Sequence, residues 1–324
     1  MGNLRAMALL FIFAAIVPLA QAAGSRTVGF EAIRVANPPE APLKGGVWFP
    51  ASRGNSAVAT GVNLPLIVIS HGGGGSYDGH YDTAIALAHA GFVVAAIDQA
   101  GDTYYDQSKV MQLWRRPQQL HRLISYMLAR WPQRRVLDAA RVGAFGFSNG
   151  GFTVLVAAGG IPDVSRIGSY CGQHPDHDLC TAMRRFGVDP RNPPIHPPAN
   201  AWVADPRIKA IVAAAPAFGF TFGKQGLRNV HIPVQLWHAT NDRHQPDPYY
   251  EAAVRRALPI KPEYRLAAGA GHYDFLPPCG KRLAAVKPEI CSDPSGFDRA
   301  AFHARFNAAI VQFFRAHLPH RTHR

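Results

Sequence analysis

The sequence has few acidic residues and no concentrated run of basic ones. Its 324 residues include 34 Lys and Arg but only 21 Asp and Glu, which gives a formal net charge of +13. Such a charge favours attraction to anionic surfaces or polymers. The basic residues are scattered or paired, however, and no nucleic-acid-binding motif is present. We therefore expect no nucleic acid among the partners of this protein.

Cysteine is scarce as well, with one residue each at Cys171, Cys180, Cys279 and Cys291. The spacings contain no C-x-x-C pair, which disfavours structural zinc. We expect neither a metal site nor an organic cofactor. Four cysteines allow three pairings. Proximity favours Cys171–Cys180 and Cys279–Cys291, each of which closes a loop that contains proline.

The apolar run at the N-terminus, Ala8 to Leu19, is too short to be a good membrane span. It follows Arg5 and precedes Ala20-Gln21-Ala22, a pattern typical of signal-peptide cleavage. We predict a signal peptide over 1–22, and an uncleaved anchor is the alternative. Export to the periplasm or the extracellular space would let the cysteines pair. After cleavage we expect a protein without membrane association.

Apolar runs alternate with helical patterns, which predicts an α/β fold with a mostly parallel central sheet of about eight strands flanked by helices. No repeat or linker divides the chain, so 23–324 is predicted to be a single domain. Strands are expected at 27–35, 45–50, 64–70, 92–98, 138–147, 208–215, 232–238 and 264–267. Helices are expected at 77–90, 118–131, 149–159, 249–257 and 297–318.

The alternation breaks at residues 161–206, which hold two cysteines and many prolines but little periodicity. We interpret this segment as a disulfide-tied cap insertion beside the active site. A passive surface loop is the alternative reading.

A glycine-flanked serine follows the buried strand 138–147. Gly146-Phe147-Ser148-Asn149-Gly150 fits G-x-S-x-G, the nucleophile elbow of α/β-hydrolases. A serine on a sharp strand-to-helix turn has strained backbone angles, and the residues two before and two after it must lack bulk. The alternative reading is a glycine-rich turn without catalytic function.

A serine hydroxyl needs a base to take its proton, and the base needs an orienting acid. In α/β-hydrolases the order along the chain is Ser, then Asp or Glu, then His. Asp242 follows the strand 232–238, and His272 follows the last strand. Each residue alone could be a turn residue, but their order and position predict the triad Ser148–Asp242–His272.

The negative charge that develops during acyl transfer needs hydrogen-bond donors. One should be the backbone N–H of Asn149, which follows the serine. The other should come from the loop His71–Gly75, where glycines let the backbone approach a substrate. We favour the Gly73 N–H, with Gly72 or Gly74 as alternatives, and expect His71 to brace the loop.

Five motifs together resemble a known family over the chain from about Thr27 to His317. It is the secreted dienelactone-hydrolase-like branch of the α/β-hydrolases, which includes relatives of platelet-activating-factor acetylhydrolases and polyester-degrading hydrolases. The motifs are Ile67-Val-Ile-Ser-His71-Gly72-Gly, Gly91-Phe-Val-Val-Ala-Ala-Ile-Asp98, Arg141-Val-Gly-Ala-Phe-Gly-Phe-Ser148-Asn-Gly-Gly, Asn241-Asp242-Arg-His-Gln-Pro and Gly269-Ala-Gly-His272-Tyr-Asp-Phe-Leu-Pro-Pro-Cys279. True dienelactone hydrolases use a cysteine nucleophile, whereas this sequence has Ser148.

These observations predict an exported, monomeric serine hydrolase that cleaves small carboxylic esters through an acyl-enzyme. A lipase-like, polyester or peptide hydrolase, or a non-catalytic binding module, is the alternative. Tyr104, Tyr105 and Trp114 are candidates for a substrate pocket or for packing. Arg115 and Arg116 are expected to be solvated charges, with an anionic substrate group as the alternative.

Overall fold

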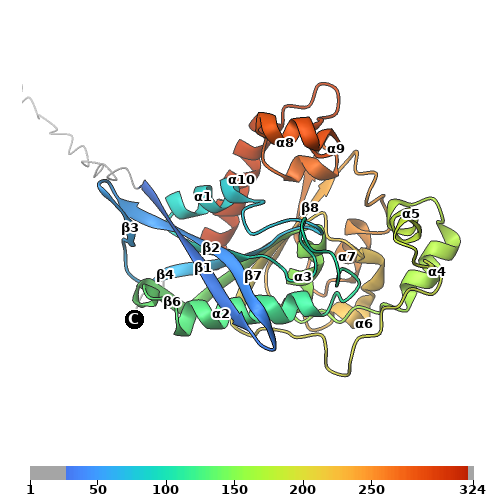
Figure 1. Cartoon of the computed structure of the whole chain (residues 1–324), viewed down its shortest axis with the longest axis horizontal. Helices are drawn as coiled ribbons and strands as arrows, with labels where there is room; N and C mark the ends of the chain where they lie inside the picture. The colour runs from blue at the N-terminus through green and yellow to red at the C-terminus, as the bar shows by residue number, and fades with distance from the viewer. Residues whose placement is uncertain (1–26, 320–324) are drawn as a thin grey trace, which may run out of the picture.

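A mixed sheet of nine strands forms the centre of the molecule (Figure 1). The computed structural model describes residues 27–319, so the predicted signal peptide lies outside the described residues. The strand order is β1-β2-β5-β4-β6-β7-β8-β9, and the short β3 pairs with β2 beside this path. The strands are β1 Thr27–Asn37, β2 Glu40–Ser52, β3 Asn55–Ala59, β4 Leu64–Ser70, β5 Val93–Ile97, β6 Leu137–Phe147, β7 Ile208–Ala214, β8 Val234–Ala239 and β9 Glu263–Ala267.

The first two strands run antiparallel, and every pair from β5 to β9 is parallel. All residues of β4 and β5 are buried. Continuous apolar sequences of this kind are typical of parallel strands that are covered on both faces. The predicted α/β-hydrolase architecture is thereby confirmed.

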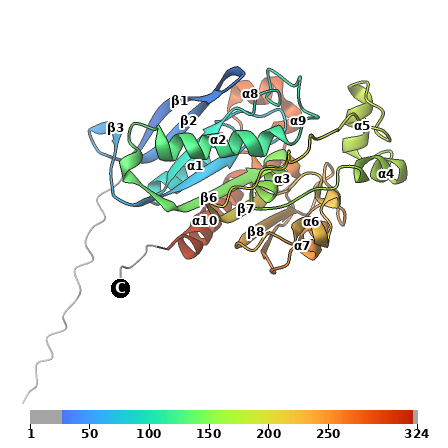
Figure 2. The same ribbon diagram turned by 90° about the horizontal axis from the view of Figure 1, so that it is seen from below.

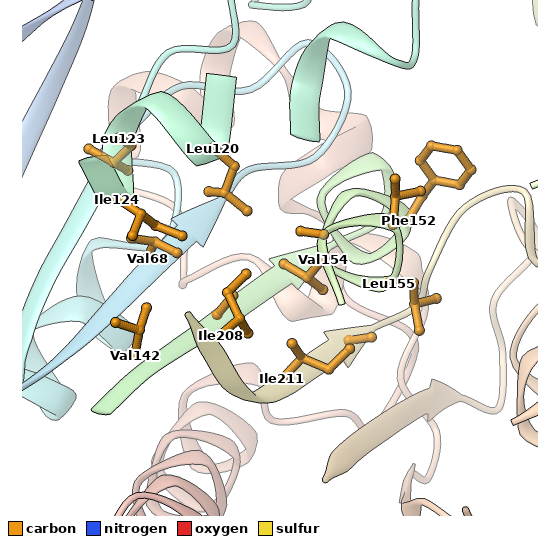
Figure 3. Packing of buried hydrophobic residues seen from close by; sticks show 14 of the residues in the cluster. Val68, Leu120, Leu123, Ile124, Val142, Phe152, Val154, Leu155, Ile208 and Ile211 are labelled. Carbon is orange, nitrogen blue, oxygen red and sulfur yellow. The ribbon is translucent and has the colours of Figure 1, made fainter. Parts of the chain in front are cut away.

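Two helices cover one face of the sheet, where Val68, Val142 and Ile211 point (Figure 3). They are α2 (Arg115–Ala129) and α3 (Asn149–Ala157). Leu120, Leu123, Ile124 and Met127 recur at helical spacing in α2, which gives this helix one apolar side.

The opposite face is covered by α1 (Tyr81–His89) and α10 (Arg299–His317). Helix α10 is capped by the carboxylate of Asp298, which accepts a hydrogen bond of 2.9 Å from the Ala301 N–H. Its phenylalanines, among them Phe306 and Phe314, pack with Ile67, Ile69 and other side chains of this face. The strands β4 to β8 therefore send residues into two separate cores, one on each face of the sheet.

Two predicted helices begin three or four residues away from their expected first residue, and two others begin two residues away from it. Helix α1 begins at Tyr81 rather than Tyr77, because the Tyr77 N–H donates to Asp98 (2.8 Å) and residues 76–79 form a turn. Helix α2 begins at Arg115, two residues before Pro117, because proline is tolerated in the first turn of a helix. The strand β3 lies between the strands expected at 45–50 and 64–70, in a stretch where no strand was expected.

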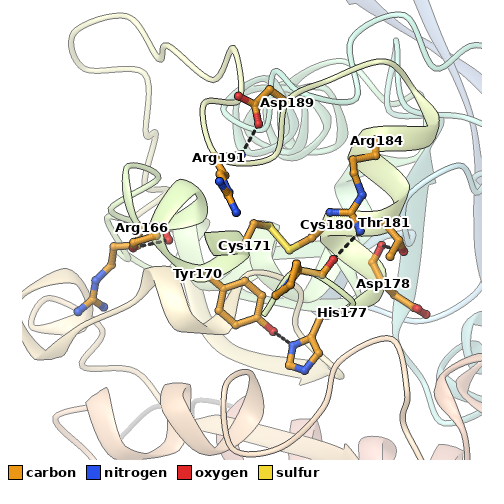
Figure 4. Close-up of a disulfide and its surroundings, with 12 residues drawn as sticks. Arg166, Tyr170, Cys171, His177, Asp178, Cys180, Thr181, Arg184, Asp189 and Arg191 are labelled. Atoms are coloured by element: carbon orange, nitrogen blue, oxygen red, sulfur yellow. Dashed lines mark hydrogen bonds between the residues drawn. A yellow bond between two sulfur atoms is a disulfide. The ribbon is translucent and has the colours of Figure 1, made fainter. Parts of the chain in front are cut away.

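Residues 161–206 contain two short helices, α4 (Arg166–Gln173) and α5 (Asp178–Arg185). They lie at the end of the molecule opposite the β1–β3 edge (Figure 2). The disulfide Cys171–Cys180 joins them, and the Tyr170 hydroxyl contacts His177 Nδ1 at 2.7 Å (Figure 4). Ile167, Tyr170 and Cys171 are the buried residues of α4, a spacing too short to reveal a helix reliably from sequence.

The second disulfide, Cys279–Cys291, encloses α8 (Lys281–Val286) and α9 (Pro288–Cys291). Both disulfides are those favoured by proximity. Two further helices, α6 (Lys224–Leu227) and α7 (Glu251–Ala257), complete the helices of residues 27–319 apart from short 3₁₀ turns. Within the same residues, no helix combines the length and apolar character required to cross a membrane.

The approach of α3 to the sheet leaves no room beside Gly150. A Cβ atom there would lie 1.9 Å from the Ser70 carbonyl oxygen, which belongs to the backbone and cannot rotate away. We expect Gly150→Ala to destabilise the protein by at least about 2 kcal/mol. At Gly172 in α4 a Cβ would meet nothing within 4 Å, so Gly172→Ala should be neutral or stabilise by up to about 1 kcal/mol. Urea unfolding of both variants tests this contrast, and equal stabilities would contradict it.

Candidate active site

The residues predicted to act together come from loops at one edge of the sheet. The strands β4, β6, β8 and β9 are parallel, so their carboxyl ends lie at the same edge. These ends lead into the His71–Gly75 loop, Ser148, the loop with Asp242 and the loop with His272. In an open α/β sheet this edge is the usual position of a ligand site.

Ser148 occupies the turn between β6 and α3 with φ of 55° and ψ of −119°. Residues with a side chain rarely adopt a positive φ, so the surrounding structure must enforce this conformation. The Ser148 N–H donates to Ala214 O at 2.9 Å. A Cβ at Gly146 would lie 2.0 Å from the Gly150 carbonyl oxygen, so the tight turn excludes any side chain there.

Ser148, His272 and Asp242 form a continuous line of contacts. His272 Nε2 lies 3.1 Å from Ser148 Oγ, and His272 Nδ1 lies 2.7 Å from Asp242 Oδ2. The other oxygen of Asp242 accepts the Gln245 N–H at 2.9 Å. Burial by itself raises the pKa of Asp242, but the charge and hydrogen bond of His272 outweigh it, and the pKa is lowered overall. Asp242 is thus an anion beside the ring nitrogen that faces it.

A buried ion pair shapes the turn that carries His272. The carboxylate of Asp274 accepts the Gly271 N–H at 2.7 Å and lies 2.8 Å from Arg299 Nη2 at the start of α10. The turn is therefore anchored to a helix of the core.

The His71–Gly75 loop lies directly against the serine turn. A Cβ at Gly73 would lie 2.7 Å from the side-chain nitrogen of Asn149, so the Asn149 side chain packs directly against the Gly73 backbone. The alternative donor Gly74 is engaged, because its N–H donates to Asp102 Oδ1 at 2.8 Å. Within residues 27–319, the backbone N–H groups of Gly73 and Asn149 donate no hydrogen bond to another backbone group.

His71 is fully enclosed beneath this loop. The Gln99 N–H donates to His71 Nε2 at 3.0 Å, and His71 Nδ1 lies 2.6 Å from the Gly72 carbonyl oxygen. Burial and the charge of Arg116 lower the pKa of His71 well below its ordinary value. The ring is neutral and braces the loop, as the sequence predicted.

The prediction of a solvated Arg116 was wrong. The side chain is 3% exposed and lies 2.5 Å from Asp102 Oδ2. Arg115 is only partly exposed and pairs with Glu40. Local sequence showed two adjacent cations, but their partners lie far away in the chain.

The aromatic candidates separate into two groups. Trp114 packs against the core that contains α2 and α3. Tyr104 and Tyr105 are 72% and 52% exposed, so they are not core residues. The Tyr104 N–H donates to Gly75 O at 3.2 Å, which places both tyrosines beside the His71–Gly75 loop.

Gln245 is a site residue that the sequence did not single out. Its side-chain nitrogen lies 3.3 Å from Ser148 Oγ, and its backbone N–H binds Asp242. The only sequence signal was its place three residues after Asp242, where a backbone donor commonly satisfies an Asp side chain.

The helices of residues 161–206 reach the same site. Asp178 at the start of α5 lies 2.6 Å from His244 Nδ1. The ring centroid of His244 is 5.1 Å from that of His272. A cavity of about 700 Å³ beside these rings is lined by Thr240, His244, His272, Tyr273, Asp293 and their neighbours. Within residues 27–319, no three His, Cys, Asp or Glu side chains are arranged to hold a metal ion.

Comparison with known families gives a match to one segment of the chain. Residues 41–121 match the family model of platelet-activating factor acetylhydrolase, isoform II. This segment is therefore similar to a family of ester hydrolases. The match confirms the predicted resemblance and covers nearly all of β2, the strands β3, β4 and β5 and the His71–Gly75 loop. Ser148, Asp242 and His272 lie outside it. No curated protein matches the chain.

The core beneath the serine turn contains a buried histidine that links stability to pH. His80 packs against Phe145 and Phe147, and its ring nitrogens have no hydrogen-bond partner among residues 27–319. Burial lowers the pKa of His80 to about 4 from 6.5. The unfolded chain therefore takes up this proton first as the pH falls.

The neutral His80 ring contributes its full share of the free energy of unfolding above pH 6.5. Between pH 6.5 and pH 4 that share decreases by about 2–3 kcal/mol, because only the unfolded chain binds the proton in this range. We expect His80→Phe to lose less stability than the wild type over this range. Urea unfolding at pH 7.5 and 4.5 measures the difference. Parallel losses in the two proteins would contradict the assignment.

Proposed function

We propose that the protein is an exported serine hydrolase that cleaves small carboxylic esters through an acyl-enzyme. The observation that carries the proposal is the unbroken contact from Ser148 Oγ through the His272 ring to the Asp242 carboxylate. The match of residues 41–121 to an ester-hydrolase family supports the same chemistry.

In the first step Ser148 Oγ attacks the carbonyl carbon of the ester. His272 Nε2 takes the hydroxyl proton as the new C–O bond forms. The carbonyl oxygen becomes an anion that the N–H groups of Gly73 and Asn149 stabilise. Each such donor contributes about 3–4 kcal/mol to the transition state. The Asp242 carboxylate accepts a hydrogen bond from His272 Nδ1–H and stabilises the imidazolium without taking its proton.

The tetrahedral intermediate then expels the alcohol. His272 Nε2 returns its proton to the leaving oxygen, and the acyl group stays on Ser148. A water molecule attacks this acyl-enzyme, with His272 again as base. The carboxylic acid leaves, and the serine recovers its proton. A serine nucleophile favours general esters over the dienelactones that a cysteine enzyme of this family cleaves.

The compartment and the domain organisation are part of the proposal. Two disulfides support an oxidising compartment, either the periplasm or the extracellular space. We propose residues 161–206 as a cap on a single domain, which is supported by the contact of Asp178 with His244 beside His272. The proposed enzyme acts as a monomer.

Hydrolysis of short p-nitrophenyl esters tests the mechanism. Ser148→Ala removes the nucleophile and should lower kcat by about 10⁴-fold or more, with an unchanged melting temperature. Ser56→Ala, at an exposed position in β3, is the control and should keep wild-type rates. Equal rates for the Ser148→Ala variant and the wild type would refute the assignment.

Covalent labelling separates an enzyme from a binding module with the same fold. A fluorophosphonate probe reacts with a serine that a neighbouring base activates. We expect one label at Ser148 in the wild type, identified by peptide mass spectrometry, and a much slower reaction in His272→Ala. An unlabelled wild-type protein would favour the binding module.

A further inference from the structure

Asp102 is a buried carboxylate that touches both loops of the proposed oxyanion site. It follows β5 and is 3% exposed. Its Oδ1 accepts the Gly74 N–H at 2.8 Å, and its Oδ2 accepts the side-chain N–H of Asn149 at 3.2 Å. Gly74 adjoins Gly73, and Asn149 is the second proposed donor. One side chain therefore ties the two halves of the site together.

Arg116 completes this connection from α2. Its Nη1 lies 2.5 Å from Asp102 Oδ2, and its Nη2 donates to the His71 carbonyl oxygen. Its Nε donates to Thr153 Oγ1 at 3.1 Å, and that hydroxyl donates to the Asn149 carbonyl oxygen at 2.6 Å. The guanidinium thus holds the start of one loop and the first turn of α3.

Stability alone is a poor explanation for this pair. Removing two charges from water costs several kcal/mol each, and apolar residues often stabilise such a position equally well. What distinguishes the pair is that its partners lie in the two segments that carry the proposed donors. A developing anion next to a lone carboxylate would be repelled, whereas Arg116 offsets that charge.

We propose that the Asp102–Arg116 pair positions the backbone N–H groups of Gly73 and Asn149 and thereby sets how strongly the oxyanion is bound. The inference rests on the proposed ester hydrolysis. Donors act at full strength only at 2.7–3.1 Å from the oxyanion, so a displacement of about 1 Å lowers the rate by about 10²-fold. Both residues are positioning residues, because they reach the substrate only through these loops.

The test compares Asp102→Asn with the wild type on a p-nitrophenyl ester and on a trifluoromethyl ketone, which binds Ser148 as a tetrahedral oxyanion. Asparagine replaces one carboxylate oxygen with an NH₂ group, so one acceptor is lost and Arg116 loses its charged partner. We expect kcat to fall by about 10–100-fold with KM within about 3-fold. The inhibition constant of the ketone should rise by about the same factor as kcat/KM falls.

Asp205→Asn is the matched control. Asp205 is also buried and paired with an arginine, Arg207, but it lies just before the first residue of β7. This substitution should lower the melting temperature without changing kcat or ketone affinity per folded molecule. Asn149→Ala removes only the side-chain bond to Asp102 and leaves the ion pair intact. If Asp102→Asn fails to fold, this variant carries the test, with a smaller loss of kcat and of ketone affinity expected.

A folded Asp102→Asn enzyme with wild-type kcat and ketone affinity would overturn the inference. So would losses that match those of Asp205→Asn, or an unchanged Asn149→Ala enzyme where Asp102→Asn does not fold. A wild-type protein that cleaves no ester and binds no ketone would instead refute the proposed function, and the inference with it. The wild type and Ser148→Ala, measured first, distinguish these cases.

Discussion

The site depends on how closely the first turn of α3 lies against the sheet. Ser148 has a positive φ at the end of β6, and Gly146 and Gly150 leave the turn without side chains on either side. Because β4 and β6 are neighbours in the sheet, the same turn lies beside the loop that follows β4. A larger residue at Gly150 would collide with the backbone of Ser70 at the end of β4. The collision would push the serine turn away from the loop that follows β4.

Buried carboxylates hold the loops at this edge of the sheet, and each has a positive or ionisable partner. Asp102 pairs with Arg116, Asp242 with His272 and Asp274 with Arg299. Each also accepts a backbone N–H, Asp242 and Asp274 from their own loops and Asp102 from the loop that follows β4. A loop has few apolar contacts of its own, so a fixed carboxylate supplies the order that packing supplies in the strands.

The fold and the order of the candidate residues were predictable because their signals are local. The buried run 64–70 and the glycine pattern around Ser148 each occupy ten residues or fewer. Asp242 and His272 followed from their positions after late strands. The helices α4 and α5 were not predicted, because each spans only eight residues and buries two or three. Two helix starts also differ from those expected by three or four residues. The Asp98 side chain binds the Tyr77 N–H, so α1 begins later, and Pro117 lies inside the first turn of α2 rather than before it.

The remaining features depend on contacts between distant segments, and Arg116 shows why a local reading fails there. Its neighbours in sequence are Arg115 and Pro117, which indicate an exposed helix start. Its partners in space come from the loops after β4 and β5 and from α3. A buried charge is tolerated only where such partners converge, and no window of sequence contains them. Gln245 is similar, since its contact with Ser148 spans 97 positions. The sequence can therefore point to a candidate nucleophile and its candidate base, whereas the charges that hold their loops in place are visible only in the fold.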